Sequence, residues 1–247
     1  KEFCTKTLEQ EGVNYDLLVD TTRTTTVKER FRSQGKTLLR VSHLQQSSIS
    51  IELQEKLIKK AMTLLVGCDL LLFSDFNYGV LPQALVDKLI EVARENKIII
   101  AADSQTSSQV GDVSRFRGVD LLMPTEREAR VSLQSREEGL VVLAEQLRQK
   151  ADGRNILLKL GADGVLIHAP DYKSDGWLTD QVDALNKFPK DVAGAGDSML
   201  VGSALALAAG SSIWEAACVG SIVAAVQVGR IGNLPVNASL LNQIIDQ

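Results

Sequence analysis

Short apolar segments alternate with amphipathic helical segments between residues 69 and 169, and this alternation constrains the fold more than any other sequence feature. The apolar segments are "DLLLFSD" (69–75), "IIIAAD" (98–103) and "VDLLMP" (119–124). Nearly continuous apolar strands are typical of a sheet that is covered on both faces. Helical spacing marks the segments between them, most clearly "LPQALVDKLIEVARENK" (81–97),. The alternation therefore predicts an α/β fold with a mostly parallel central sheet and helices on both faces.

The rest of the chain adds a hairpin and several helices. The segments "TTTVKERF" (24–31) and "KTLLRVS" (36–42), split by the turn signal "RSQG", predict a small β hairpin,. The segment "ILLKLGADGVLIHA" (156–169) predicts two strands around a "GAD" turn,. Helices are expected within 47–67, 125–133 and 137–151, and then over 194–209 and 213–228,. Because the chain shows no internal repeat or Pro-rich linker, we expect residues 1–247 to form one domain.

Charge and cysteine content exclude several classes of function. The net charge is −4 and no basic cluster occurs, which argues against a nucleic-acid partner,. The apolar stretches are broken by Gly, Ser or charged residues before they reach the length of a membrane span,. Three widely spaced cysteines predict reduced thiols and a cytoplasmic protein,. Two histidines are too few for a multi-histidine metal centre, and neither lies near a nucleophile signature,.

The segment "DVAGAGDSML" (191–200) carries the strongest chemical signal. Gly194, Ala195 and Gly196 precede an apolar helical run, so they lie where backbone N–H groups have no intrahelical acceptor and the helix dipole is positive,. Small residues let an anion approach such a helix start. Asp197 follows at once, and a carboxylate there can take a proton from a hydroxyl that attacks a phosphate,.

Other interpretations of this segment stay open at this point. An Asp in the first turn of a helix is favoured by the dipole alone. A dinucleotide-binding loop is not favoured, because the pattern G-x-G-x-x-G is incomplete, with Met199 at the last position,. The P-loop pattern G-x-x-x-x-G-K-[S/T] does not occur,.

Polar residues follow three of the predicted strands. They are Ser74-Asp75, Asp103-Ser104 and Thr125. Ligands in parallel sheets bind beyond the carboxyl ends of the strands. A role in capping turns is about as probable for each residue taken singly. Three such ends together favour an anion-handling site near the start of the 194–209 helix.

These residues resemble a known family. "DVAGAGDSM" is similar to the D-T-x-G-A-G-D signature of the ribokinase-like (PfkB-type) sugar kinases. "LLLFSDFNYGVL", "RFRGVDLLMPTEREA", "LLKLGADGVLI" and "AAVQVGRIGN" follow the order of the heptose-phosphate kinase branch. The resemblance implies a ribokinase-like three-layer αβα fold with a small β hairpin as lid. It also implies that the chain is N-terminally truncated relative to the family, which has an earlier sugar-binding segment.

The resemblance assigns roles position by position. Asp197 matches the catalytic base, and Gly194, Ala195 and Gly196 match the anion hole for the transferring phosphoryl group. Glu128 matches the Glu of the N-x-x-E motif, which handles magnesium and phosphate. The remaining matches are Gly161 and Gly164 beside the nucleotide, Ser221 and Gly232 beside the adenine, and Asp191 and Ala193 at a monovalent-cation loop.

The sequence departs from the family pattern at four places. Thr125 replaces the Asn of N-x-x-E. "SDFNYG" (74–79) lacks the Lys of the usual S-D-Y-x-K-G, and Gln105 replaces the Lys of D-P-K. These two losses weaken the case for a phosphorylated sugar. Lys159 stands where relatives often have Thr, and either it adds a positive charge near the nucleotide or it is a solvated surface residue.

The resemblance implies an ATP-dependent kinase that phosphorylates a hydroxyl of a heptose or heptose phosphate. Its expected cofactors are ATP and Mg²⁺, with K⁺ in some relatives, and its expected partners are the sugar, ATP and a second copy of the chain. A homodimer is expected because the apolar residues of the 24–42 hairpin need cover,. Two alternatives are a kinase for another small polyol or nucleoside and a non-catalytic nucleotide-binding relative.

Overall fold

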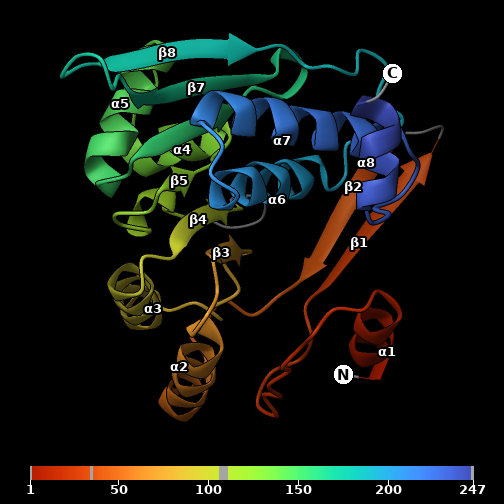
Figure 1. The fold of residues 1–247 in the computed structure, drawn as a ribbon. Helices are drawn as coiled ribbons and strands as arrows, with labels where there is room; N and C mark the ends of the chain where they lie inside the picture. The colour runs from red at the N-terminus through yellow and green to blue at the C-terminus, as the bar shows by residue number, and fades with distance from the viewer. Residues whose placement is uncertain (1, 34–35, 106–110, 246–247) are drawn as a thin grey trace.

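The computed structural model describes residues 2–33, 36–105 and 111–245, and its body is built on a six-stranded sheet (Figure 1). The strand order β3-β4-β5-β6-β7-β8 follows the sequence. Strands β3 to β6 are parallel, whereas β7 and β8 are antiparallel to their neighbours. The strands are β3 (Leu70–Asp75), β4 (Ile99–Ser104), β5 (Leu121–Leu122), β6 (Asn155–Lys159), β7 (Val165–Pro170) and β8 (Trp177–Val182).

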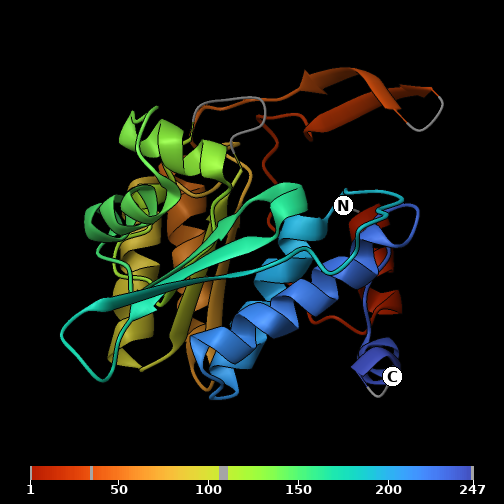
Figure 2. The same cartoon turned by 90° about the horizontal axis from the view of Figure 1, so that it is seen from above.

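Helices cover both faces of this sheet, so the body has three layers (Figures 1 and 2). One face packs against α2 (Ile51–Leu65), α3 (Gln83–Glu95), α4 (Glu126–Leu133) and α5 (Leu140–Ala151), and the other against α6 (Ala195–Ala208) and α7 (Ile213–Val228). Side chains alternate between the faces. In β6, Ile156 and Leu158 join the core under α3 and α5, and Leu157 joins the core under α6 and α7,. The mostly parallel three-layer prediction is confirmed.

A two-stranded hairpin stands off this body (Figure 2). It consists of β1 (Val27–Ser33) and β2 (Lys36–His43), which pair antiparallel with a register shift after Phe31. The hairpin prediction is confirmed, although β1 begins three residues later than expected. Residues 34 and 35 of the "RSQG" turn lie outside the described residues. The remaining elements are α1 (Glu2–Gln10), α8 (Ala238–Ile245) and the short 3₁₀ turns η1 (Val113–Arg115) and η2 (Gly161–Asp163).

Local sequence signals explain where the helices begin. Ser50 caps α2, and its side chain accepts a hydrogen bond from the Leu53 amide,. Ser212 and Glu215 form a capping box at the start of α7,. Among the described residues, no helix combines the length and the apolarity needed to cross a membrane.

Candidate active site

One cavity opens at the carboxyl ends of the parallel strands, where α6 begins beside α7. Its volume is about 760 Å³. A cavity at this edge of an open α/β sheet is the usual place for a ligand. The charged and amide-bearing residues that line it are Arg40, Asp103, Gln105, Arg127, Glu128, Lys159, Asp183, Asn186, Lys187 and Asp197.

The four residues Gly194–Asp197 all line this cavity. Gly194 immediately precedes α6 and has a φ of 78°. A side chain there would be strained, and its β-carbon would collide with the side chain of Asn233,. The first turn of α6 has N–H groups without intrahelical acceptors and lies at the positive end of the dipole. The start of α6 therefore borders the cavity with the chemistry that an anion requires.

Asp197 is half-buried in the first turn of α6. Gln105, which directly follows β4, donates a hydrogen bond from its Nε2 to Asp197 Oδ1 at 3.4 Å. In the sequence, Gln105 was notable only because it replaces the lysine of the family pattern D-P-K. In the structure it holds the carboxylate of Asp197 at the cavity wall without adding a charge.

Lys159 lies beneath the start of α6, at the end of β6. Its ammonium forms an ion pair with Asp103 at the end of β4, and both side chains are largely buried. A β-carbon on Gly196 would lie 3.3 Å from Lys159 Nζ. Of the two interpretations of Lys159, the structure therefore favours a positive charge at the anion-binding helix start. Burial raises the pKa of Asp103, Lys159 opposes this rise, and the charges of Glu128 and Asp197 add to it,.

Glu128 lines the cavity and also caps α4. Its Oε2 accepts a hydrogen bond from the Thr125 amide at 2.7 Å, and the Thr125 side chain accepts one from the Glu128 amide at 3.2 Å. Thr125 thus serves as the helix cap at the position of the family Asn. In the described part of the chain, no three acidic, histidine or cysteine side chains converge to hold a metal by themselves. Mg²⁺ bound with a nucleotide needs only one or two carboxylates besides phosphates and water, and Glu128 fits that role,.

The glycines assigned to the nucleotide lie in the turn between β6 and β7, and both line the cavity. Gly164 has a φ of 88°, and a β-carbon there would collide with the Val182 carbonyl. Ser221 of α7 also lines the cavity. Sequence reasoning missed residues 183–187, which follow β8 and form much of one wall. No motif marks this segment, because it becomes part of the site only through the pairing of β8 with β7.

Asp191, Ala193 and Gly232 meet beside the cavity and are absent from its lining. Asp191 Oδ1 accepts a hydrogen bond from the Ala193 amide at 3.1 Å, and its Oδ2 accepts one from the Gly232 amide at 3.4 Å. Gly232 was assigned to the adenine. The structure places it against the loop that leads into α6.

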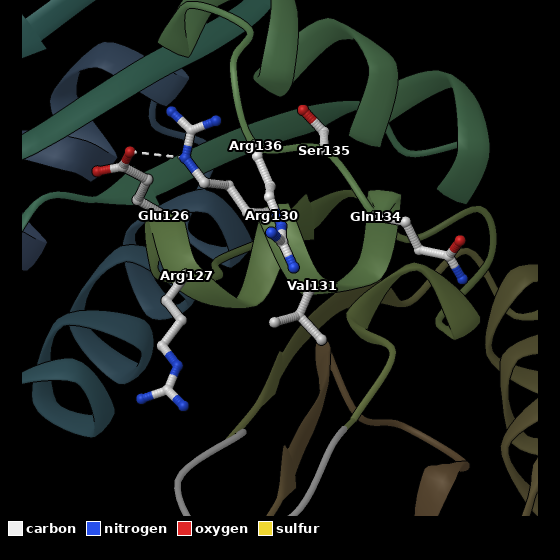
Figure 3. Close-up of a pocket in the computed structure, with 7 residues that line it drawn as sticks. All are labelled: Glu126, Arg127, Arg130, Val131, Gln134, Ser135 and Arg136. Carbon is white, nitrogen blue, oxygen red and sulfur yellow. Dashed lines mark hydrogen bonds and ion pairs between the residues drawn. The ribbon is translucent and has the colours of Figure 1, made fainter.

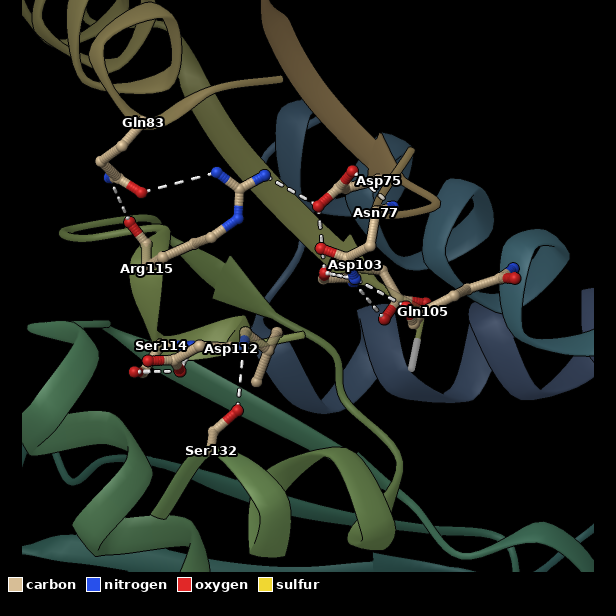
Figure 4. A network of polar contacts seen from close by, with 11 residues as sticks. Asp75, Asn77, Gln83, Asp103, Gln105, Asp112, Ser114, Arg115 and Ser132 are labelled. Atoms are coloured by element: carbon tan, nitrogen blue, oxygen red, sulfur yellow. Dashed lines mark hydrogen bonds and ion pairs between the residues drawn. The ribbon is translucent and has the colours of Figure 1, made fainter. Parts of the chain in front are cut away.

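The polar strand ends separate into two groups. Asp103 and Thr125 line the cavity, whereas Asp75 belongs to a neighbouring network that reaches Asp103 through Ser104 (Figure 4). There Arg115 donates to Asp75 Oδ2 at 2.7 Å, and Ser104 Oγ donates to the same oxygen at 3.1 Å. Asp75 is thus engaged in a buried ion pair that ties β3 to η1.

A second cavity of about 570 Å³ lies over α4, and Figure 3 shows the seven residues that line it. Arg130 donates a hydrogen bond from Nε to Glu126 Oε1 at 2.8 Å along one wall. Arg127 lines this cavity and the larger one. The two cavities are therefore neighbours that share one arginine.

The three-layer body and its hairpin have a ribokinase-like fold, as comparison with solved structures shows. Phosphofructokinase-2 from Escherichia coli in complex with substrates and products superposes with a TM-score of 0.76 at 17% identity, covering 99% of this chain and 78% of that chain. Ribokinase from Thermotoga maritima superposes with a TM-score of 0.74 at 18% identity, covering 100% of this chain and 77% of that chain.

Sequence comparison identifies the family. The model of the pfkB family carbohydrate kinases matches residues 1–237, so this chain belongs to that family. It is 30% identical over 242 residues to bifunctional protein HldE of Desulfatibacillum aliphaticivorans, covering 96% of this chain and 47% of that protein. It is 30% identical over 217 residues to the HldE of Campylobacter fetus, covering 84% of this chain and 45% of that protein. The chain therefore spans about half the length of the curated relatives that it matches.

Proposed function

We propose that this protein is an ATP-dependent sugar kinase that transfers the γ-phosphate of ATP to a hydroxyl of a heptose or heptose phosphate. Membership of the pfkB family supports the reaction class, and the HldE relatives support the heptose. The observation that carries the proposal is the position of Asp197, which lies at the cavity wall one residue after Gly194–Gly196. A base and an anion-binding helix start are thereby brought to one place.

The chemistry follows from this juxtaposition. The sugar hydroxyl gives its proton to the Asp197 carboxylate while its oxygen forms a bond to the γ-phosphorus. The bond from that phosphorus to the bridging oxygen breaks, and ADP leaves. The amides at the start of α6 and the Lys159 ammonium stabilise the charge on the transferring group,. Mg²⁺ supplies further neutralisation of the phosphates when bound, and Glu128 is the carboxylate placed to hold it,.

Two arginines support a phosphorylated sugar despite the lysines that the sequence lacks. Arg40 of β2 and Arg127 of α4 both line the cavity. Guanidinium groups bind phosphate oxygens in a bidentate manner. Comparing phosphate transfer to a heptose phosphate, a free heptose and other sugars and nucleosides tests this part of the proposal. A preference for an unphosphorylated acceptor would contradict it.

The proposal also includes a cytoplasmic location, because ATP is the co-substrate and Cys4, Cys68 and Cys218 are free thiols,. It further includes a homodimer formed through the β1–β2 hairpin, since a hairpin of two strands is marginally stable by itself.

Replacing Asp197 tests the reaction directly. Asp197→Asn keeps the size of the side chain and removes its basicity, so turnover should fall by about 10²- to 10⁴-fold. The affinity for MgATP should change little, because the amides and Lys159 remain. Steady-state kinetics and calorimetry measure the two effects. Asp180→Asn on the exposed strand β8 is the matched control and should behave as wild type. Turnover near wild type for Asp197→Asn would exclude Asp197 as the base.

A further inference from the structure

A buried glutamine holds the loop that leads into α6. Gln227 is the last but one residue of α7, and it is almost fully inaccessible to solvent. Its Nε2 donates one hydrogen bond to the Ala193 carbonyl at 3.3 Å and another to the Gly232 carbonyl at 3.2 Å. Ala193 immediately precedes Gly194. The glutamine therefore clamps the anion-binding loop to residues 230–232.

The orientation of this amide is fixed by its neighbours. Arg230 donates from Nη2 to Gln227 Oε1 at 3.0 Å, and the same guanidinium donates to the carbonyls of Leu234 and Pro235. An arginine can only donate, and a backbone carbonyl can only accept. Turning the amide round would set its NH₂ group against the guanidinium and its oxygen against two carbonyls. Nε2 must therefore face Ala193 and Gly232.

The oxygens around Nε2 are those that a monovalent cation would need. They are the carbonyls of Ala193 and Gly232, which both accept from Nε2. The carboxylate of Asp191 accepts hydrogen bonds from the amides of the same two residues. Carbonyl oxygens replace the hydration shell of K⁺ where proteins bind it. Here the two carbonyls already accept hydrogen bonds from the Gln227 amide, which takes up the space between them. The site therefore does not fit the K⁺ that the resemblance implies at Asp191 and Ala193.

We propose that the Gln227 amide takes the place of a monovalent cation and positions the Gly194–Gly196 loop in its absence. Gln227 is thus a positioning residue, and the loop should be formed equally well in K⁺, Na⁺ or a large organic cation. This inference rests on the proposed function only in taking the phosphates of ATP as what the Gly194–Gly196 loop binds. The geometry of the clamp is independent of what the loop binds.

The first test uses the wild-type protein. Its thermal unfolding and its affinity for MgATP are measured in KCl, NaCl and tetramethylammonium chloride at an ionic strength of about 0.1 M, so that screening is the same. We expect the unfolding temperature and the dissociation constant to be the same in all three salts. A rise of about fivefold or more in MgATP affinity on adding K⁺ would overturn the inference.

The second test removes the amide. Gln227→Ala vacates the space between the two carbonyls and leaves them without donors, so its unfolding temperature in tetramethylammonium chloride should fall by about 4 °C or more. KCl should restore most of this loss, because K⁺ can now bind the vacated oxygens. Gln227→Glu should respond to K⁺ in the same direction, because Arg230 faces only one carboxylate oxygen and the other would face the two carbonyls without a donor.

Asn155→Ala is the matched control, because Asn155 is also a buried amide that donates to a carbonyl, that of Asp120 at 2.8 Å. Its loss of stability should be equal in all three salts. If Gln227→Ala and Gln227→Glu also lose stability equally in the three salts, the inference is wrong. The unfolding measurements need neither ATP nor sugar. If MgATP does not bind, but K⁺ raises the unfolding temperature of the Gln227 variants alone, the kinase proposal is wrong and the inference about Gln227 is supported.

Discussion

Asp103 and Lys159 form the buried ion pair that sets the charge beneath the start of α6. A buried pair contributes little net stability, but removing one partner is costly because the other charge stays buried. Asp103 already has a raised pKa because of its burial, and Lys159 opposes that rise. The pair therefore keeps the Lys159 ammonium beside Gly196, where a phosphate can bind.

Replacing the two members singly and together separates stability from binding. Lys159→Met should lower the free energy of unfolding by about 3–5 kcal/mol, since Asp103 loses its partner. Adding Asp103→Asn should recover most of that loss. MgATP affinity should stay about tenfold or more below wild type in the double variant, because the charged hydrogen-bond donor is gone. Urea unfolding and calorimetry measure these effects, and Asp103→Asn alone serves as the control that keeps the lysine. A double variant that binds MgATP as tightly as wild type would show that Lys159 does not meet the phosphates.

The sequence predicted the parts of the site that lie within one short segment. Gly194–Asp197 could be recognised because the small residues, the carboxylate and the helix signal are adjacent. Contacts between distant segments could not be foreseen. The bond from Gln105 to Asp197 and the pair of Lys159 with Asp103 depend on how β4 and β6 are placed in the sheet. Gln227 gave no local signal, since one amide near the end of an apolar helix reads equally well as a surface residue.

Elements marked by apolar runs, by helical composition or by signals at their ends were predicted, and weakly marked ones were not. The strands β3, β4 and β6 and the helices α3, α6 and α7 lie close to the expected ranges. Strand β5 shrinks to two residues, with one further bridge between Thr125 and Lys159, because Pro124 cannot donate to the ladder,. Strand β8 was not predicted. Five of its six residues are exposed, so its sequence lacks the alternation that marks a half-covered strand,.

A network around Glu145 joins α5 to the antiparallel edge of the sheet. Glu145 Oε2 lies 2.8 Å from Arg148 Nε and 2.8 Å from His168 Nε2 of β7. The Arg148 guanidinium in turn covers the ring of Trp177 on β8. The hydrogen bond from Arg148 lowers the pKa of Glu145 from 4.5 to about 2, against a smaller opposing effect of burial.

The sign of this shift gives a pH dependence. A carboxyl group with a lowered pKa in the folded state stabilises the fold above its unfolded pKa of 4.5, and this stabilisation is lost as the pH falls towards about 2,. Glu145→Gln should therefore cost about 1 kcal/mol of unfolding free energy at neutral pH, because the network is partly exposed. The difference from wild type should shrink below about pH 4.5. Urea unfolding of both proteins at several pH values measures this difference in the free energy of unfolding. Glu55→Gln on an exposed position of α2 should show no such trend. A Glu145→Gln deficit that stays constant with pH would contradict this assignment.

At the scale of the whole molecule, the hairpin has two faces of different character. The register pairs Lys28 with Ser42 and Arg30 with Arg40, so these side chains share one face,. Lys28 lies over the rings of Phe76 and Tyr78 on the body, and Arg40 lines the cavity. This face therefore belongs to the site.

The other face is exposed and only partly apolar. It carries Val27 and the directly paired residues Phe31 and Leu39, which are each about half accessible, and also the ion pair of Glu29 with His43. Figure 2 shows the hairpin standing off the αβα body, and Val27, Phe31 and Leu39 stay accessible among the described residues. We propose that the apolar residues of this face meet the same residues of a second hairpin, because a single two-stranded sheet is marginally stable. The dimer that we propose would thus bury the outer faces of both hairpins and fix their inner faces over the two sites.

A charge on the outer face tests this arrangement. Phe31→Glu with Leu39→Glu places carboxylates where the two hairpins would meet, so the protein should become monomeric in analytical ultracentrifugation. Its acceptor KM should rise more than its MgATP affinity falls, because Arg40 on the same hairpin would lose its fixed position over the cavity while the α6 loop is untouched. Leu64→Glu on the exposed side of α2 introduces the same charge away from the hairpin and should remain dimeric. A wild-type protein that sediments as a monomer at micromolar concentration, or a Leu64→Glu variant that dissociates equally, would refute the hairpin as the interface.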